Sequence, residues 1–70
     1  MVTIYMPLLD EGVDVWRPVE ATHLSTGAYL VEGEVPVGEE WAFDPGTVVR
    51  CERKRFSGGE EGLTAVEVVS

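Results

Sequence analysis

The chain has a single cysteine, Cys51, among its 70 residues, so it cannot form an intramolecular disulfide. A domain of this length buries only about 60% of the surface that its unfolded chain exposes, which leaves a marginal hydrophobic core. We therefore expect one domain, residues 1–70, in which the few aromatic side chains contribute much of the packing. Self-association is a further way in which so small a core gains stability.

Basic residues are also scarce. Five lysines and arginines stand against thirteen acidic residues, and the formal net charge is −8. Affinity for nucleic acid depends on basic side chains that neutralise phosphates, so this balance disfavours nucleic acid as a partner. It also disfavours anionic membranes, and no apolar run approaches the roughly 20 residues needed to span a bilayer. Because no signal peptide is visible and the cysteine is unpaired, we predict a cytoplasmic protein.

Motifs for catalysis or for cofactor binding are missing as well. His23 is the only histidine, so no second imidazole is available to complete a metal site or a catalytic pair. The glycines at positions 58, 59 and 62 are not followed by the lysine and hydroxyl residue of a P-loop. The sequence therefore predicts neither an enzyme nor a bound cofactor.

The pattern that is present is that of short strands. Eight glycines and four prolines divide the chain into runs in which apolar residues alternate, and no helical apolar stripe of useful length occurs. We expect strands over residues 2–9, from 14 or 15 to a turn at 25–27, and over 28–32, 47–56 and 63–69. A short extended piece should cover 39–43, and Asp44-Pro45-Gly46 should form a type II turn. Pro18 predicts an edge or a bulge within the second strand.

Five short strands with a long hairpin favour an all-β fold, a small SH3-like barrel. An OB-like barrel is the alternative, although it normally has a longer chain and a helix. Alternation places Val2, Ile4, Met6 and Leu8 on one face of the first strand. For Trp16, Trp41 and Phe43, packing in the core is the favoured role.

Two stretches of the chain carry a resemblance. Residues 8–12 read LLDEG and are followed by VWRPVEA at 15–21, while residues 41–52 read WAFDPGTVVRCE. Both stretches are similar to a group of small bacterial proteins that has no assigned activity. The resemblance covers most of the chain and implies an SH3-like β-barrel. It implies no site residues, and a fold does not by itself carry a function.

The best candidates for a binding surface are Trp16, Arg17 and the acidic loop residues Asp10, Glu11 and Asp14. Tryptophan and arginine are enriched among the residues that dominate binding interfaces. On a regular strand Trp16 and Arg17 point to opposite faces, so one surface can use both only where the strand bends. The spacing of the three acids does not match a calcium loop, so we expect a solvated loop and no metal.

Three other features have structural explanations. Cys51 alternates with Val49 and Arg53 on a strand and is predicted to be a small buried side chain. Four of the five basic residues fall within residues 50–55, where we expect ion pairs with acids on neighbouring strands. His23, at the end of a hairpin strand, is expected to be an ordinary, partly exposed residue.

The sequence thus predicts a non-enzymatic protein-interaction module. Its partner would be another protein or a second copy of the chain. Two further possibilities are an accessory subunit of a larger complex and, from the net charge, an acidic inhibitor of a basic protein.

Overall fold

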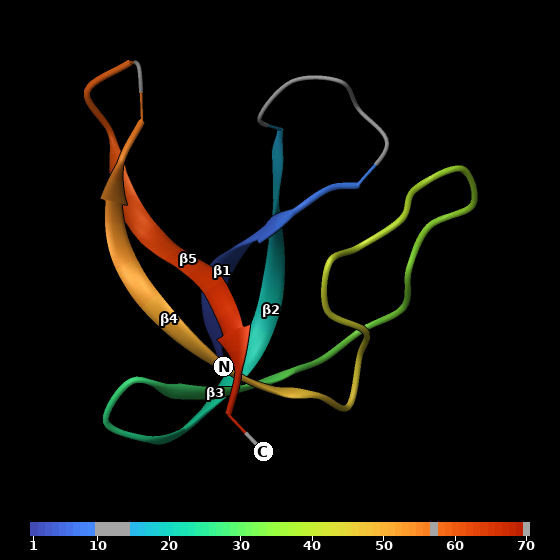
Figure 1. Ribbon diagram of the computed structural model, residues 1–70, viewed down its shortest axis with the longest axis horizontal. Helices are drawn as coiled ribbons and strands as arrows, with labels where there is room; N and C mark the ends of the chain where they lie inside the picture. Colours follow the sequence, from blue (N-terminus) through green and yellow to red (C-terminus); the bar gives the residue numbers. More distant parts are fainter. Residues whose placement is uncertain (10–14, 57, 70) are drawn as a thin grey trace.

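The computed structural model describes residues 1–9, 15–56 and 58–69, and within these ranges it contains five strands and no helix. The prediction of an all-β fold is therefore confirmed. The strands are β1 (Val2–Pro7), β2 (Trp16–Ser25), β3 (Ala28–Val31), β4 (Val48–Arg55) and β5 (Glu61–Val68) (Figure 1).

The strands close into a barrel in the order β1-β2-β3-β4-β5. Each strand pairs antiparallel with the next, and a parallel bridge between Tyr5 of β1 and Thr64 of β5 completes the ring. This consecutive order has no Greek-key connection, which is the connection that an OB barrel contains. The small five-stranded barrel is confirmed, and its strand order favours the SH3-like arrangement.

The core follows from the alternation of side chains along each strand. Ile4, Met6, Val31 and Val49 are the largest fully buried side chains. Around them lie the other buried members of the core, which are Val19, Ala21, Trp41, Cys51 and Ala65. Trp41 comes from the connection between β3 and β4 and is only 6% exposed, as expected for a core residue, and Phe43 packs against the same cluster while partly buried.

Both predicted turns are confirmed. Gly27 joins β2 to β3 with φ of 77°, and Gly46 has φ of 90° at the third position of the turn that begins at Asp44. The Thr47 N–H donates to the Asp44 carbonyl at 3.2 Å and closes that turn. Positive φ is the conformation that glycine adopts without steric cost, so glycine fixes where each turn forms.

Several strand bounds differ from those expected. β1 ends at Pro7, and Leu8 lies beyond it in an isolated bridge to Trp41. The short extended piece predicted at 39–43 pairs with the chain after β1 through the single bridge of Trp41 to Leu8. Glu61 and Gly62, expected in a loop, begin β5, because they pair with Arg55 and Lys54 of β4.

The bulge considered at Pro18 does not form there. Pairing of β1 with β2 is continuous from Val2↔Ala21 to Pro7↔Trp16, and Pro18 lies opposite Tyr5. The Leu8 N–H donates to Val15 O, and the Glu32 N–H on the other side donates to Glu20 O. By alternation the missing N–H of Pro18 faces away from β1, so Pro18 interrupts no β1–β2 hydrogen bond. Pro18 therefore lies at an open edge of β2, as the alternative prediction had it, and the bulge in this strand falls between His23 and Ser25.

Candidate functional site

Trp16 lies outside the core, in an aromatic cluster with Tyr5 and Phe56. The Trp16 and Phe56 ring centroids are 5.4 Å apart, those of Tyr5 and Phe56 are 4.9 Å apart, and both pairs meet edge to face. The three side chains are half-buried and come from β1, from the start of β2 and from the residue after β4. The expectation that Trp16 packs in the core is therefore wrong. Trp16 shares the strand face of Pro18 and Glu20, whereas Val19 and Ala21 point inward.

Gly62 of β5 provides the space for this cluster. A Cβ atom at position 62 would lie 2.3 Å from Cε2 of Tyr5, far inside van der Waals contact. The Tyr5 ring can therefore lie directly over β5 only because residue 62 has no side chain. Phe56 borders the same position, at 3.4 Å from that Cβ.

Lys54 lies against Trp16, the third aromatic member of the cluster. Its Nζ is 5.0 Å from the centroid of the Trp16 ring, within the range of a cation–π contact. Strand alternation places Lys54 on the face of β4 that carries Glu52, and opposite Gly62 of β5. The ammonium group is thus held beside Trp16 although the lysine side chain is exposed.

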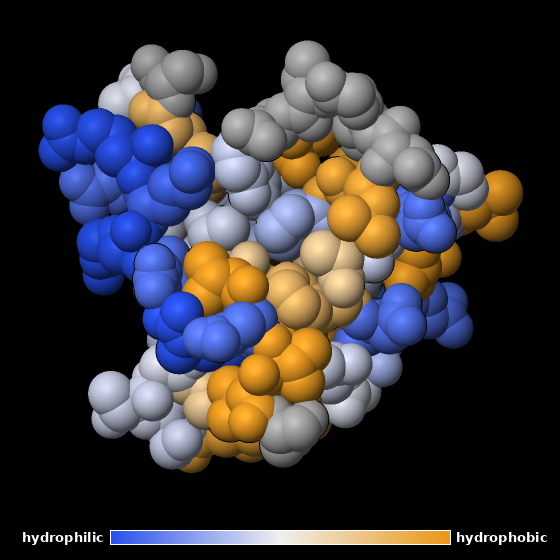
Figure 2. Space-filling view, viewed as in Figure 1, coloured by the Kyte–Doolittle hydropathy of each residue, from blue (hydrophilic) through white to orange (hydrophobic). Residues whose placement is uncertain are grey.

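A groove of about 340 Å³ begins at Trp16 and Lys54. One side of the groove is formed by the end of β1 and the start of β2. The other side is formed by the paired strands β4 and β5, which diverge from β1 and β2 in Figure 1. Figure 2 shows hydrophilic residues gathered over β4 and β5, with a hollow between these residues and strands β1 and β2. The walls are Pro7, Trp16, Glu52, Arg53, Lys54, Thr64, Ala65 and Val66. The groove therefore combines an aromatic ring, apolar side chains and basic groups.

Thr64 is the unusual member of the groove wall. It is only 4% exposed, and its Oγ1 has no hydrogen-bond partner among the residues that the structure describes. A buried polar group without a partner destabilises a fold by about 1–3 kcal/mol, so a threonine at this position needs an explanation. Thr64 also forms the bridge to Tyr5 that closes the barrel, which fixes it between β1 and β4.

Arg17 points away from this groove. Its Nε and Nη2 atoms each lie 2.7 Å from Oε2 of Glu39, and the indole N–H of Trp41 donates to Oε1 of the same carboxylate at 3.0 Å. The hydrogen bond from Trp41 and that from Arg17 lower the pKa of Glu39. This trio ties the connection between β3 and β4 to the start of β2.

Of the predicted site residues, the structure brings Trp16 and Arg17 to the rim of a second depression of about 330 Å³, at the open edge of β2. Their side chains nevertheless have different partners, because Trp16 contacts Phe56 and Lys54 whereas Arg17 is ion-paired with Glu39. Asp10, Glu11 and Asp14 lie outside the described residues.

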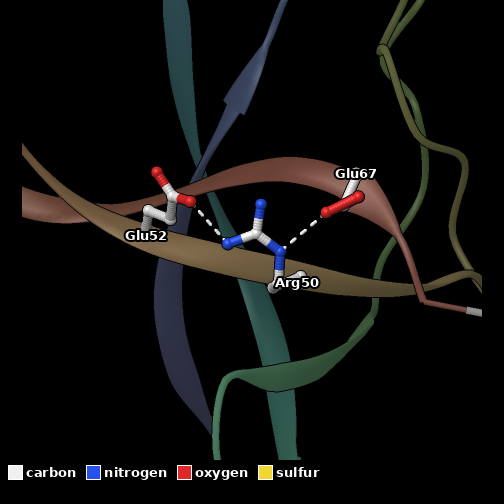
Figure 3. Close-up of polar contacts among 3 residues, drawn as sticks. All are labelled: Arg50, Glu52 and Glu67. Carbon is white, nitrogen blue, oxygen red and sulfur yellow. Dashed lines mark hydrogen bonds and ion pairs between the residues drawn. The ribbon is translucent and has the colours of Figure 1, made fainter.

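The basic run of β4 forms the expected ion pairs across strands. Arg50 contacts Glu52 of its own strand and Glu67 of β5, the latter at 2.8 Å (Figure 3), and both contacts raise the pKa of the Arg50 guanidinium. Arg55 and Arg53 both approach Glu61, at 3.1 Å and 3.8 Å. Lys54 makes no such pair with any described residue.

Cys51 and His23 are placed much as predicted. Cys51 is 8% exposed within the core, and burial raises the pKa of its thiol to about 11. A nucleophilic cysteine needs a lowered pKa, so this thiol has the opposite character. His23 is exposed on β2, with its ring 5.0 Å from that of Tyr29 on β3.

Sequence reasoning missed Lys54, Thr64 and Val66 as groove residues. Alternation along β4 gave the face of Lys54, but only the pairing of β1 with β5 brings that face next to Trp16. Nothing in the sequence marked Thr64 as a groove residue, because threonine is common in strands.

No family model, curated protein or solved structure matches this chain. Within the described ranges no helix is long and apolar enough to cross a membrane. The same ranges contain no group of three or more histidine, cysteine or acidic side chains that could hold a metal ion.

Proposed function

We propose that this protein is a non-enzymatic interaction module of the cytoplasm that binds a segment of another protein in the groove beside Trp16. One observation carries the proposal. A half-buried tryptophan lies outside the core, at the rim of an open groove whose walls include the exposed side chain of Val66. Aromatic residues at the edge of a pocket are typical anchors of protein recognition.

The chemistry of the groove supports binding more than catalysis. Among the described residues its titratable groups are Glu52, Arg53 and Lys54, and Glu52 is already ion-paired with Arg50. The neighbouring Cys51 points into the core with a raised pKa, so it offers no nucleophile at neutral pH. The groove walls combine apolar side chains with a few polar and charged groups, which is the usual composition of a recognition site.

The test is a selection from a displayed library of random peptides, with the full chain immobilised. We expect enrichment of related sequences on the wild type and its loss on Trp16→Ala, while His23→Ala, an exposed change on β2 away from the groove, retains it. Circular dichroism and thermal unfolding must first show that Trp16→Ala is folded. Failure to enrich any sequence on the wild type, or binders equally retained by folded Trp16→Ala, would contradict the proposal.

If Trp16→Ala does not fold, the selected peptides are mapped instead on the wild type by nuclear magnetic resonance. The indole N–H of Trp16 then reports the groove, and that of Trp41 reports the core. Shifts confined to residues outside the groove walls would count against the proposal in the same way.

A further inference from the structure

We propose that the segment bound in this groove carries a carboxylate next to an apolar side chain. The proposal rests on the function proposed above and names the chemistry that the same groove would recognise. Its evidence is the distribution of charge around Trp16, the unpartnered hydroxyl of Thr64 and the apolar wall.

Among the residues that the structure describes, Lys54 is the basic side chain without an ion pair. All four arginines lie within 4 Å of a glutamate, with contacts Arg17–Glu39, Arg50–Glu52, Arg50–Glu67, Arg53–Glu61 and Arg55–Glu61. Lys54, in contrast, has no glutamate or aspartate of the described residues within ion-pair distance. Its contact with Trp16 holds the ammonium at the groove wall, where its three N–H donors can meet a carboxylate.

The charges inside the groove also favour an anionic ligand. Glu52 is the acid among the described wall residues, and it is ion-paired with Arg50, which also contacts Glu67 (Figure 3). Arg53 adds a second cation to the wall, at 3.8 Å from its own partner Glu61. The net charge of the whole molecule is −8, but at physiological salt charges more than about 8 Å apart are largely screened. Groups at the groove therefore dominate its choice of ligand.

Thr64 supplies the independent observation. Thr64 lines the groove with a side chain that is only 4% exposed, and its buried Oγ1 has no partner among the described residues. A hydroxyl can donate a hydrogen bond to a carboxylate, and a ligand that reached the buried Oγ1 of Thr64 would remove the cost of leaving it unpaired.

The remaining wall accounts for the apolar part of the ligand. Besides Trp16, the apolar wall residues are Pro7, Ala65 and Val66, of which Val66 is 39% exposed and Ala65 is buried at 1%. A volume of about 340 Å³ is near the lower end of the range for small-ligand sites, so it suits one side chain with its flanking backbone. An open groove along two strands admits a chain that continues beyond it, which favours a protein segment over a free metabolite.

The experiment is a titration of the full, isotope-labelled chain with three capped peptides of equal length. Each has one central leucine, flanked by two aspartates, two asparagines or two lysines. The aspartate peptide should shift the Trp16 indole signal and bind about threefold to tenfold more tightly than the asparagine peptide, as expected for one new contact to a charged group. The lysine peptide should bind most weakly.

Variants identify the groups responsible. Lys54→Gln keeps most of the stem over Trp16 and should remove most of the preference for aspartate, while Arg55→Gln, an equal change of charge outside the groove, should retain it. Thr64→Val should weaken binding of the aspartate peptide without loss of folding. Equal effects of Lys54→Gln and Arg55→Gln would overturn the assignment of Lys54.

The remaining outcomes separate this inference from the function on which it rests. Equal affinity for aspartate and asparagine peptides, or a preference for lysine, would overturn the carboxylate while leaving a peptide groove in place. Acetate that shifts the groove signals and competes as well as the peptide would show a small-carboxylate site instead. If none of the three peptides shifts the groove signals, the inference fails, and the library selection decides the proposed function independently.

Discussion

Cys51 illustrates how burial alone sets the chemistry of a residue. The folded thiol has its pKa raised to about 11 from an ordinary value of 9.0, because the core disfavours the thiolate. Between these two values the unfolded chain has lost the proton and the folded chain retains it. The contribution of Cys51 to stability is therefore complete below pH 9.0 and is lost as the pH rises toward about 11.

We predict that the difference in free energy of unfolding between the wild type and Cys51→Ala shrinks across this window. Urea titrations of both proteins from pH 8 to pH 11 measure it, and the variant cancels the effect of other groups that titrate there. A difference that stays constant over the whole range would show that Cys51 is not buried in the folded protein.

Gly62 is the second residue with a consequence that can be measured. An alanine Cβ there would overlap the Tyr5 ring at 2.3 Å, and Phe56 limits where the ring can move. We predict that Gly62→Ala lowers the free energy of unfolding by about 1–3 kcal/mol, the usual cost of overpacking. Gly58→Ala is the control, because nothing lies within 4 Å of its Cβ, and it should change stability by less than about 0.5 kcal/mol.

A double-mutant cycle assigns the cause. In a Tyr5→Ala background the overlap is gone, so Gly62→Ala should cost little or become favourable. A full cost in that background would mean that the strand requires glycine for another reason.

At the scale of elements, the connection between β3 and β4 is held to β2 by one carboxylate, Glu39. Because hydrogen bonds from Trp41 and Arg17 lower its pKa below the ordinary 4.5, Glu39 stabilises this attachment above pH 4.5. The stabilisation is lost as the pH falls through the lowered, folded-state pKa.

We predict that the indole N–H resonance of Trp41 titrates with a midpoint below pH 4.5 in the wild type. In Glu39→Gln, which cannot ionise, this transition should be absent. A midpoint at or above the ordinary value would show that the bonds to Arg17 and Trp41 do not persist in solution.

The open edge of β2 is the second feature at this scale. Residues 16–19 pair with β1 and, among the described residues, with no strand on the other side. Exposed strand edges promote association, and a proline with no N–H on the exposed side counteracts it. We predict that Pro18→Thr keeps the fold but raises self-association in sedimentation velocity, while Pro36→Thr, outside the strands, does not. Unchanged sedimentation of Pro18→Thr would mean that other features protect this edge.

The sequence was most informative about elements whose causes are local. The turns at Gly27 and Gly46 and the hairpin of β2 with β3 follow from neighbouring residues, and they form where predicted. The position of Trp16 was predicted incorrectly because it depends on Phe56 and Lys54, which are remote in sequence. The groove could not be predicted for the same reason, since it exists only where the parallel bridge of Tyr5 to Thr64 joins the two ends of the chain.

At the scale of the whole molecule, the charge of −8 combines with a specific arrangement of the few bases. Each arginine contacts at least one glutamate, and Arg50 contacts two. These pairs lie at the surface, where water and salt screen them and each contributes little to stability. Their larger consequence is that the basic run of β4 presents little uncompensated positive charge to a polyanion.

We therefore predict that the protein binds a 20-base-pair DNA duplex no more tightly than about 1 μM at physiological salt, within the range of non-specific binding. The comparison is a variant with Glu52, Glu61 and Glu67 changed to glutamine, which removes the partners of Arg50, Arg53 and Arg55 and changes the net charge from −8 to −5. If ion pairing is what neutralises β4, this variant should bind the duplex more tightly than the wild type, with a steeper dependence on salt. Fluorescence anisotropy of labelled DNA at several salt concentrations measures both. A nanomolar, salt-sensitive complex of the wild type would show that the arginines exchange their glutamates for phosphates, and the exclusion of nucleic acid as a partner would then be wrong.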